Sequence, residues 1–168
     1  EEYAEKRSSI RQETIQVKKL REVHLGSHIR MIFENKQTVQ YQIQEMLRIE
    51  KIFESSEIQD ELDVYNALVP NGSNLKATMM IEYPDVAERV EALSRLIGVE
   101  KSIYFQVDGH DKVFPICNED LERETDVKTS AVHFMRFEFD QNMIADFVSG
   151  SDVKVGSAHP NYDYETSL

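Results

Sequence analysis

Cysteine is almost absent from this sequence, and tryptophan is missing altogether. The 168 residues include one cysteine, four prolines and six glycines. A single cysteine excludes an intramolecular disulfide and a zinc site made of several cysteines. Cys117 follows the apolar run 113–116, so we expect a buried structural thiol, with a reactive thiol as the alternative.

Positive charge is also scarce. The chain has 19 basic residues against 31 acidic ones, which gives a net charge of −12. The densest basic stretch, residues 18–21, is short and lies in a predicted helix, where it is best explained as a solvated face. Because phosphate contacts need a cationic surface, this acidic protein is expected to bind neither nucleic acid nor an anionic membrane.

Long apolar runs are missing too. No run approaches the roughly 18 residues that a membrane span requires, and we recognise no signal peptide, so we expect a cytoplasmic protein. The hydrophobic fraction of 40% argues against disorder despite 30% charged residues. The length fits a single domain over 1–168, whose polar tail from about residue 160 is expected to lie on the surface or to be mobile.

Hydrophobic periodicity predicts an α+β fold. Helices are expected over residues 2–21, 36–53, 55–68, 86–97 and 142–148. Strands are expected over residues 28–33, 75–83, 103–107, 112–117, 131–139 and, as an edge strand, 152–155. Asp108-Gly109 between two of these strands predicts a hairpin. Strands and helices do not alternate regularly, which favours a mixed or mostly antiparallel sheet with helices packed on one face.

One acidic residue falls on an apolar helix face. At about 100° per residue, Glu50 lies among Val39, Ile43, Met46 and Leu47. A carboxylate that faces the core is costly unless it meets a cation, a metal or a proton. Glu50 therefore has two interpretations, a structural ion pair or buried hydrogen bond, and a functional site.

Four other polar residues are weaker candidates. Glu45 lies away from the apolar stripe, with Tyr41 at i−4 and Arg48 at i+3, and an intrahelical Glu45–Arg48 pair is the simple interpretation. His28 follows His24 at the spacing of a helical metal pair, but the glycine between them argues against a helix. No cluster of histidine, cysteine or aspartate has the spacing of a recognised metal site, so no metal ligand is assigned.

The segment 131–139 carries a second anomaly. Period two places His133 on one face of this strand, together with Met135, Phe137 and Phe139, and Arg136 on the other face. A lone histidine on an apolar face is usually a core residue with satisfied hydrogen bonds. The sharper hypothesis is that His133 and Glu50 converge, with Arg136 nearby, to form a polar centre that holds a metal or acts as acid and base.

Several segments resemble the signature of an uncharacterised bacterial family that is labelled only as a domain of unknown function. They are residues 39–50 (VQYQIQEMLRIE), 72–78 (GSNLKAT), 81–85 (IEYPD) and 128–134 (KTSAVHF). The resemblance covers nearly the whole chain, and it implies no activity, cofactor or catalytic residue. Genes of this family are often found near those of rubrerythrin-like proteins and iron–sulfur oxidoreductases, so the resemblance implies a link to redox or peroxide metabolism and a redox-protein partner.

Two hypotheses follow. The first is a non-catalytic accessory or binding protein, linked to a redox or peroxide-stress system, in which an ion pair closes off Glu50. The second is a metal-binding protein or an enzyme with a cavity that reaches Glu50, His133 and Arg136. The frequency of symmetric oligomers adds the expectation of a homodimer.

Overall fold

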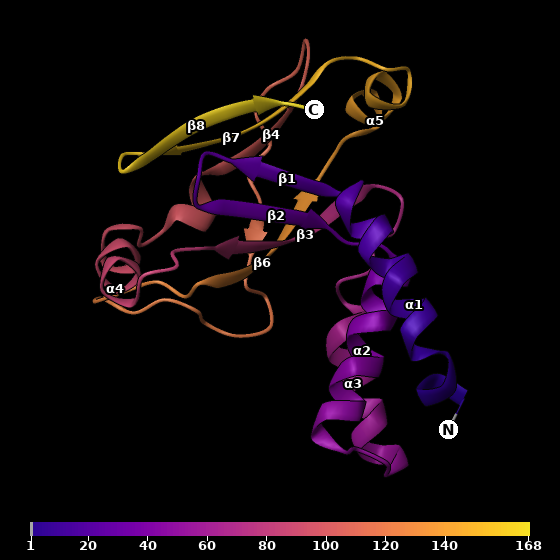
Figure 1. Cartoon of the computed structure of the whole chain (residues 1–168). Helices are drawn as coiled ribbons and strands as arrows, with labels where there is room; N and C mark the ends of the chain where they lie inside the picture. The colour runs from indigo at the N-terminus through magenta and orange to yellow at the C-terminus, as the bar shows by residue number, and fades with distance from the viewer. Residues whose placement is uncertain (1) are drawn as a thin grey trace.

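The computed structural model describes residues 2–168, and its strands form two antiparallel sheets (Figure 1). The five-stranded sheet has the order β1 (Glu22–Leu25), β2 (Ile29–Phe33), β3 (Asn74–Ile81), β6 (Val132–Glu138), β5 (Ile116–Cys117). The three-stranded sheet has the order β4 (Ile103–Val107), β7 (Val153–His159), β8 (Tyr162–Ser167). With the helices described below, these sheets confirm the predicted α+β class.

The hydrophobic core lies between the two sheets. Alternate residues of β3 and β6 face it, and Met79 and Phe137 are fully buried. Phe105 of β4 and Val155 of β7 meet them from the smaller sheet. Because burying one such side chain contributes roughly 1.5–3 kcal/mol, this double layer supplies most of the folding free energy.

A glycine lets the smaller sheet bring an aromatic ring close to its backbone. Gly156 of β7 stands opposite Tyr104 of β4 in the antiparallel register. A Cβ atom on Gly156 would lie 2.3 Å from the Tyr104 ring, so no other residue fits at this position without a shift.

Three helices form an arm beside the sheets: α1 (Glu2–Lys19), α2 (Lys36–Glu50) and α3 (Ser55–Asn66) (Figure 1). Asn35 starts α2 with a capping box, in which its Oδ1 atom accepts from the Thr38 amide at 2.9 Å and its amide donates to Thr38 Oγ1 at 3.0 Å. The helix ends at Lys51, whose φ of 56° is left-handed. We call α1, α2 and α3 the helical arm.

The remaining helices close the ends of the two-sheet body. Helix α4 (Val86–Arg95) begins at the Asp85 cap, and the following 3-10 helix η1 (Val99–Ser102) leads into β4. Helix α5 (Gln141–Val148) packs its Phe147 ring edge-on against Phe105, with ring centroids 5.9 Å apart. No helix within residues 2–168 is long and apolar enough to cross a membrane.

The structure differs from the sequence-based expectation near the C-terminus. The segment predicted as an edge strand is β7, which lies at the centre of its sheet because the tail after Pro160 forms β8 beside it. The tail is therefore ordered, although most of its side chains are exposed. Tyr162 anchors it, since this buried hydroxyl donates to the Leu25 carbonyl at 2.6 Å and accepts from the Ile29 amide at 3.1 Å.

The predicted hairpin at Asp108-Gly109 forms only in part. Phe105 and Val113 exchange two backbone hydrogen bonds of 2.8 and 2.9 Å. The chain then crosses to the larger sheet, where Ile116 and Cys117 pair with β6. The turn was thus predicted from its residues, but the partner of the second strand was not.

Candidate functional site

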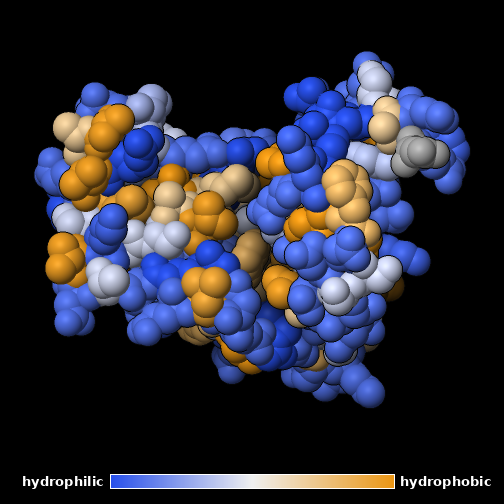
Figure 2. Space-filling view, turned by 90° about the horizontal axis from the view of Figure 1, so that it is seen from below, coloured by the Kyte–Doolittle hydropathy of each residue, from blue (hydrophilic) through white to orange (hydrophobic). Residues whose placement is uncertain are grey.

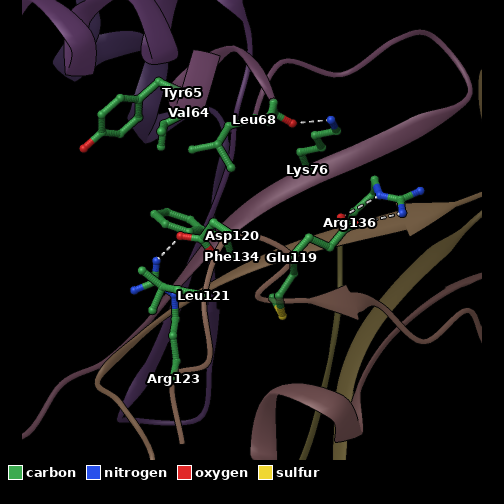
Figure 3. Close-up of a pocket in the computed structure, with 12 residues that line it drawn as sticks. Val64, Tyr65, Leu68, Lys76, Glu119, Asp120, Leu121, Arg123, Phe134 and Arg136 are labelled. Atoms are coloured by element: carbon green, nitrogen blue, oxygen red, sulfur yellow. Dashed lines mark hydrogen bonds and ion pairs between the residues drawn. The ribbon is translucent and has the colours of Figure 1, made fainter. Parts of the chain in front are cut away.

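A groove lies between α3 and the outer face of the five-stranded sheet (Figures 2 and 3). Figure 2 shows the molecule as two bulky parts with a hollow between them, in which hydrophobic residues are visible. The larger section of the groove has a volume of about 360 Å³. A second section of about 200 Å³ adjoins it and shares Tyr65, Leu68 and Phe134 with the first.

The groove exists because only the inner face of the sheet is covered by the second sheet. Met80, Val132 and Phe134 occupy outer positions of β3 and β6 and are only half-buried. Helix α3 stands over them without burying any residue of its own. Tyr65 comes from this helix, and its partial burial, together with the Glu61 carboxylate, raises the pKa of its hydroxyl above the usual value.

Arg136 lies at one end of the groove with all three guanidinium nitrogens engaged (Figure 3). Its Nε and Nη2 atoms donate to Glu119 at 2.9 and 2.6 Å, and Nη1 donates to Glu138. These hydrogen bonds raise the pKa of Arg136 and lower the pKa of Glu119, and the pKa of Glu138 is lowered first by the Asn74 amide and then by Arg136. Each of the three guanidinium nitrogens of Arg136 is therefore paired with a carboxylate.

Arg123 lines the same groove with most of its donors unused. Its guanidinium lies 4.6 Å from the centroid of the Phe134 ring, and its Nη2 atom donates to Asp120. Its Nε atom is buried and finds no hydrogen-bond partner among residues 2–168. A buried guanidinium with an unused donor is costly, so an acceptor that reached Arg123 Nε would gain a hydrogen bond there.

The two sections of the groove are held open by polar anchors. Lys76 of β3 donates from Nζ to the carbonyl of Ala67, which caps the end of α3. In the second section, Glu34 is buried and accepts hydrogen bonds from the hydroxyls of Thr38 and, at 2.8 Å, Thr78. Glu34 is thus satisfied within the fold.

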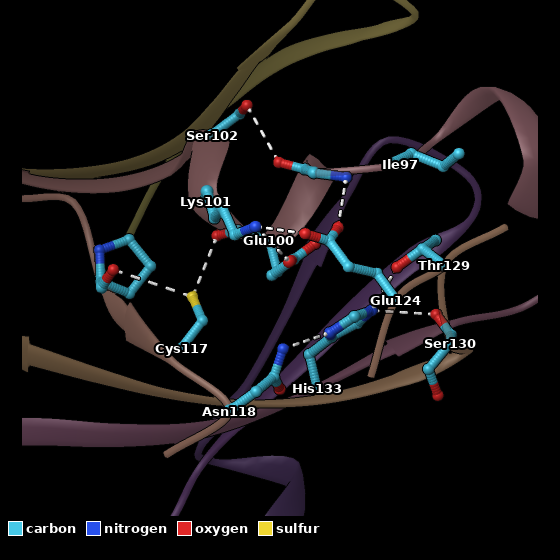
Figure 4. A network of polar contacts seen from close by, with 12 residues as sticks. Ile97, Glu100, Lys101, Ser102, Cys117, Asn118, Glu124, Thr129, Ser130 and His133 are labelled. Atoms are coloured by element: carbon cyan, nitrogen blue, oxygen red, sulfur yellow. Dashed lines mark hydrogen bonds and ion pairs between the residues drawn. The ribbon is translucent and has the colours of Figure 1, made fainter. Parts of the chain in front are cut away.

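His133 lies on the other side of β6, inside a buried polar network (Figure 4). Asn118 accepts from the Phe134 amide through Oδ1 and therefore presents its NH₂ group to His133 Nδ1 at 3.0 Å. His133 Nε2 faces the Ser130 carbonyl at 2.9 Å and Thr129 Oγ1 at 3.0 Å. Nε2 carries the proton, because a carbonyl only accepts, and burial lowers the pKa of the ring. Both nitrogens of this neutral histidine are occupied.

Glu100 is the unusual member of this network. Its carboxyl is fully buried, and neither oxygen has a hydrogen-bond partner among residues 2–168. Burial raises its pKa, and burial likewise raises the pKa of the Cys117 thiol to about 12. Nearby Glu124 accepts from Lys101 Nζ and, at 3.1 Å, from the Gly98 amide, which lowers the pKa of Glu124. The Cys117 thiol is half-buried, and its raised pKa keeps it protonated.

The predicted convergence of Glu50, His133 and Arg136 is wrong. Glu50 is exposed in the last turn of α2, where the helix extends beyond the sheets, although Val39 and Ile43 earlier in the same stripe are buried. His133 faces the core, whereas Arg136 faces the groove. No group of three metal-ligating side chains forms anywhere in residues 2–168.

Glu45 is the better-paired glutamate of α2. Its carboxylate accepts from Arg7 Nε and Nη2 at 2.7 and 2.9 Å and from the Tyr3 hydroxyl. The expected Glu45–Arg48 pair is also present, at 3.3 Å. These donors, Arg7 first, hold the pKa of Glu45 well below its usual range and join α1 to α2.

Tyr41 and His28 also serve the fold. The Lys18 ammonium lies 5.9 Å from the centroid of the Tyr41 ring. His28 stacks on Tyr83 with ring centroids 3.8 Å apart, and its Nδ1 atom lies 3.0 Å from the Glu82 carbonyl. Neither residue points to a common site.

Sequence reasoning missed the two residues that mark the groove and the buried network. Arg123 lies in the acidic segment 118–126, which has no periodicity, so no sequence signal places it over Phe134. Glu100 lies within the 3-10 helix η1, directly after Val99, and this apolar neighbour is the only local feature that distinguishes it from a surface acid.

Comparison with known proteins identifies relatives without a described activity. A family profile described as "Protein of unknown function (DUF3501)" matches residues 1–168. The chain is similar to a solved structure described as a novel protein of unknown function from Burkholderia pseudomallei K96243. The two share 47% sequence identity with a TM-score of 0.94, over 99% of this chain and 86% of that one. No protein of curated function matches.

Proposed function

We propose a function for this chain, which belongs to the DUF3501 family of proteins of unknown function: it is a non-catalytic binding protein whose ligand occupies the groove between α3 and the five-stranded sheet. The observation that carries the proposal is the groove itself, a hollow of about 360 Å³ with Phe134 on its floor and Leu68 on its wall. Ligand pockets in proteins have this size and this mixture of apolar lining with a few polar groups.

The state of the polar residues favours binding over catalysis. A general acid or base must have a free position from which it can exchange a proton with a substrate. His133 uses both ring nitrogens within the fold, and Arg136 uses all three guanidinium nitrogens. The groups that the sequence suggested for chemistry therefore act as structural contacts.

The position of the groove suggests what binding does to the protein. One wall belongs to the helical arm and the floor belongs to the sheet, so a ligand contacts both. A ligand that binds only the folded, closed arrangement stabilises it in proportion to its concentration. We propose that the ligand fixes the arm against the body.

The wider biological role that we propose is the one expected from the sequence. An accessory role in a redox or peroxide-stress system and a redox-protein partner rest on the family resemblance. A homodimer, a cytoplasmic location and the lack of nucleic-acid binding rest on frequency and composition, including the net charge of −12. The groove is compatible with each of them.

The proposal is tested with the neutral fluorophore N-phenyl-1-naphthylamine and two matched valine variants. Val64 lines the groove and is 55% exposed, whereas Val90 on α4 is 62% exposed and lies outside it. We expect saturable fluorescence enhancement in the parent, at least tenfold weaker binding in Val64→Asp and unchanged binding in Val90→Asp. Circular dichroism checks that both variants fold. Equal binding by both folded variants, or no saturable binding to the parent, would contradict the proposal.

A further inference from the structure

We infer that the ligand of the groove is an amphipathic organic anion, with a carboxylate head at Arg123 and an apolar body along Phe134 and Leu68. The inference rests on the proposed function of the groove and adds the chemical class of its ligand.

The first argument is the contrast between two arginines of one groove. Arg136 is neutralised by two carboxylates, Glu119 and Glu138, which engage its three nitrogens. Arg123 has one acidic partner, Asp120, which takes only Nη2. Since the guanidinium plane presents donors that match a carboxylate in pairs, Arg123 is the position where an incoming carboxylate gains hydrogen bonds.

The second argument is the environment of the Arg123 head. Its side chain is only 16% exposed, and its guanidinium lies over the face of the Phe134 ring at 4.6 Å from the centroid. Partial removal from water strengthens charge-assisted hydrogen bonds. The Nε atom is buried, so a carboxylate reaches it only if neighbouring side chains move when the ligand enters.

The third argument is the charge of the groove compared with that of the chain. The two sections are lined by four cationic side chains, Lys18, Lys76, Arg123 and Arg136, and by three anionic ones, Glu34, Glu119 and Asp120. The whole chain instead has 19 basic against 31 acidic residues. With Glu138, which pairs with Arg136, the charges at the groove balance, so an anion meets far less repulsion there than over the rest of this acidic protein.

The apolar part of the ligand follows from the floor of the groove. Beyond Phe134 the floor continues over Val132, Met80 and Ile32 into the section of about 200 Å³. The one carboxylate there, Glu34, is already satisfied by two threonine hydroxyls and would repel a second anionic group. The geometry therefore suits one anionic head followed by an apolar chain.

Three ligands with the same ten-carbon chain test the inference: decanoate, decyltrimethylammonium and 1-decanol. Each is titrated below its micelle concentration into the full chain, in competition with N-phenyl-1-naphthylamine. We expect decanoate to bind at least tenfold more tightly than the other two. Arg123→Gln should abolish this preference without weakening 1-decanol, whereas Arg95→Gln, the matched control on α4 outside the groove, should keep it.

The possible failures are distinguishable. If all three ligands bind equally and Val64→Asp weakens them all, the groove is a binding site but the anionic class is wrong. If Val64→Asp changes none of them, the proposed function fails as well. If Arg123→Gln does not fold, Arg123→Lys replaces it: we expect severalfold weaker decanoate and unchanged 1-decanol, and unchanged decanoate would overturn the inference.

Discussion

The two-sheet body and the helical arm are built on different physical principles. In the body, large side chains such as Phe105, Phe137 and Met79 are almost completely buried between the sheets. In the arm, α3 buries no residue, α1 buries only Thr14, and α2 buries Thr38, Val39 and Ile43. Other apolar residues of the arm, such as Ile49, remain as much as 60% exposed. The body is held by the hydrophobic effect, and the arm has little of it.

What the arm has instead is a polar junction around Glu45. This carboxylate gathers Arg7, Tyr3 and Arg48 from two helices. Partly exposed ion pairs contribute far less than buried apolar area. The comparison teaches that the rigid floor and the adaptable wall of the groove come from regions of very different stability, which suits a site that closes around a ligand.

The largest effect is expected from breaking the body. Phe137→Ala removes a fully buried ring of β6 that packs against Phe105 with ring centroids 6.2 Å apart. We expect a loss of about 3–5 kcal/mol in the free energy of unfolding, measured by urea denaturation. Val64→Ala in the arm serves as the comparison and should change it by less than about 0.5 kcal/mol. Similar losses in both variants would show that the arm is as well packed as the body.

A smaller effect is expected from breaking the arm. Glu45→Gln removes the charge that Arg7 and Tyr3 share, and we expect about 1 kcal/mol less stability and faster amide exchange in α1 and α2, with the sheets unchanged. Because the folded pKa of Glu45 is lowered, its contribution is present above the ordinary glutamate pKa and lost as the pH falls below it.

The control for this change is Glu91→Gln. Glu91 forms an exposed pair with Arg95 at 3.6 Å on α4. We expect no measurable change in stability or exchange there. Faster exchange in the sheets of Glu45→Gln would mean that arm and body unfold together, which contradicts the comparison.

The smallest effect concerns Glu100, a buried carboxyl of the body that accepts no hydrogen bond within residues 2–168. The folded pKa of Glu100 is raised by burial, so its protonated form is favoured and its contribution declines as the pH rises above the ordinary glutamate pKa. Glu100→Gln cannot titrate, and we expect it to gain stability relative to the parent between pH 4 and pH 8, by at most about 1 kcal/mol. Urea denaturation at both pH values measures this change.

For Glu124→Gln, we expect the stability relative to the parent to change with pH in the opposite direction. The folded pKa of Glu124 is lowered, first by Lys101, so its stabilisation is present at neutral pH and lost in acid. This variant should lose stability relative to the parent at pH 8 more than at pH 4. The same sign for Glu100→Gln and Glu124→Gln would show that Glu100 is ionised and paired in solution.

The sequence was informative wherever a local pattern decides the outcome. The apolar stripe that includes Val39 and Ile43 predicted α2, and the period-two alternation of residues 131–139 predicted β6. Local patterns did not predict that Ile116-Cys117 pairs with β6 of the larger sheet, or that the tail forms β8 beside β7. Pairing partners are chosen by long-range packing, which a local pattern does not contain.

The two glutamates of α2 show the same difference between what a local pattern predicts and what long-range packing decides. Periodicity gave Glu50 the inward face, yet the structure covers Glu45 and leaves Glu50 exposed, because Arg7 and Tyr3 of α1 lie over one and nothing lies over the other. The sequence by itself determined the α+β class, the acidic character and the faces of most helices and strands. Only the tertiary structure decided what those faces meet, including Arg123 over Phe134, since burial and charge pairing depend on residues that are distant along the chain.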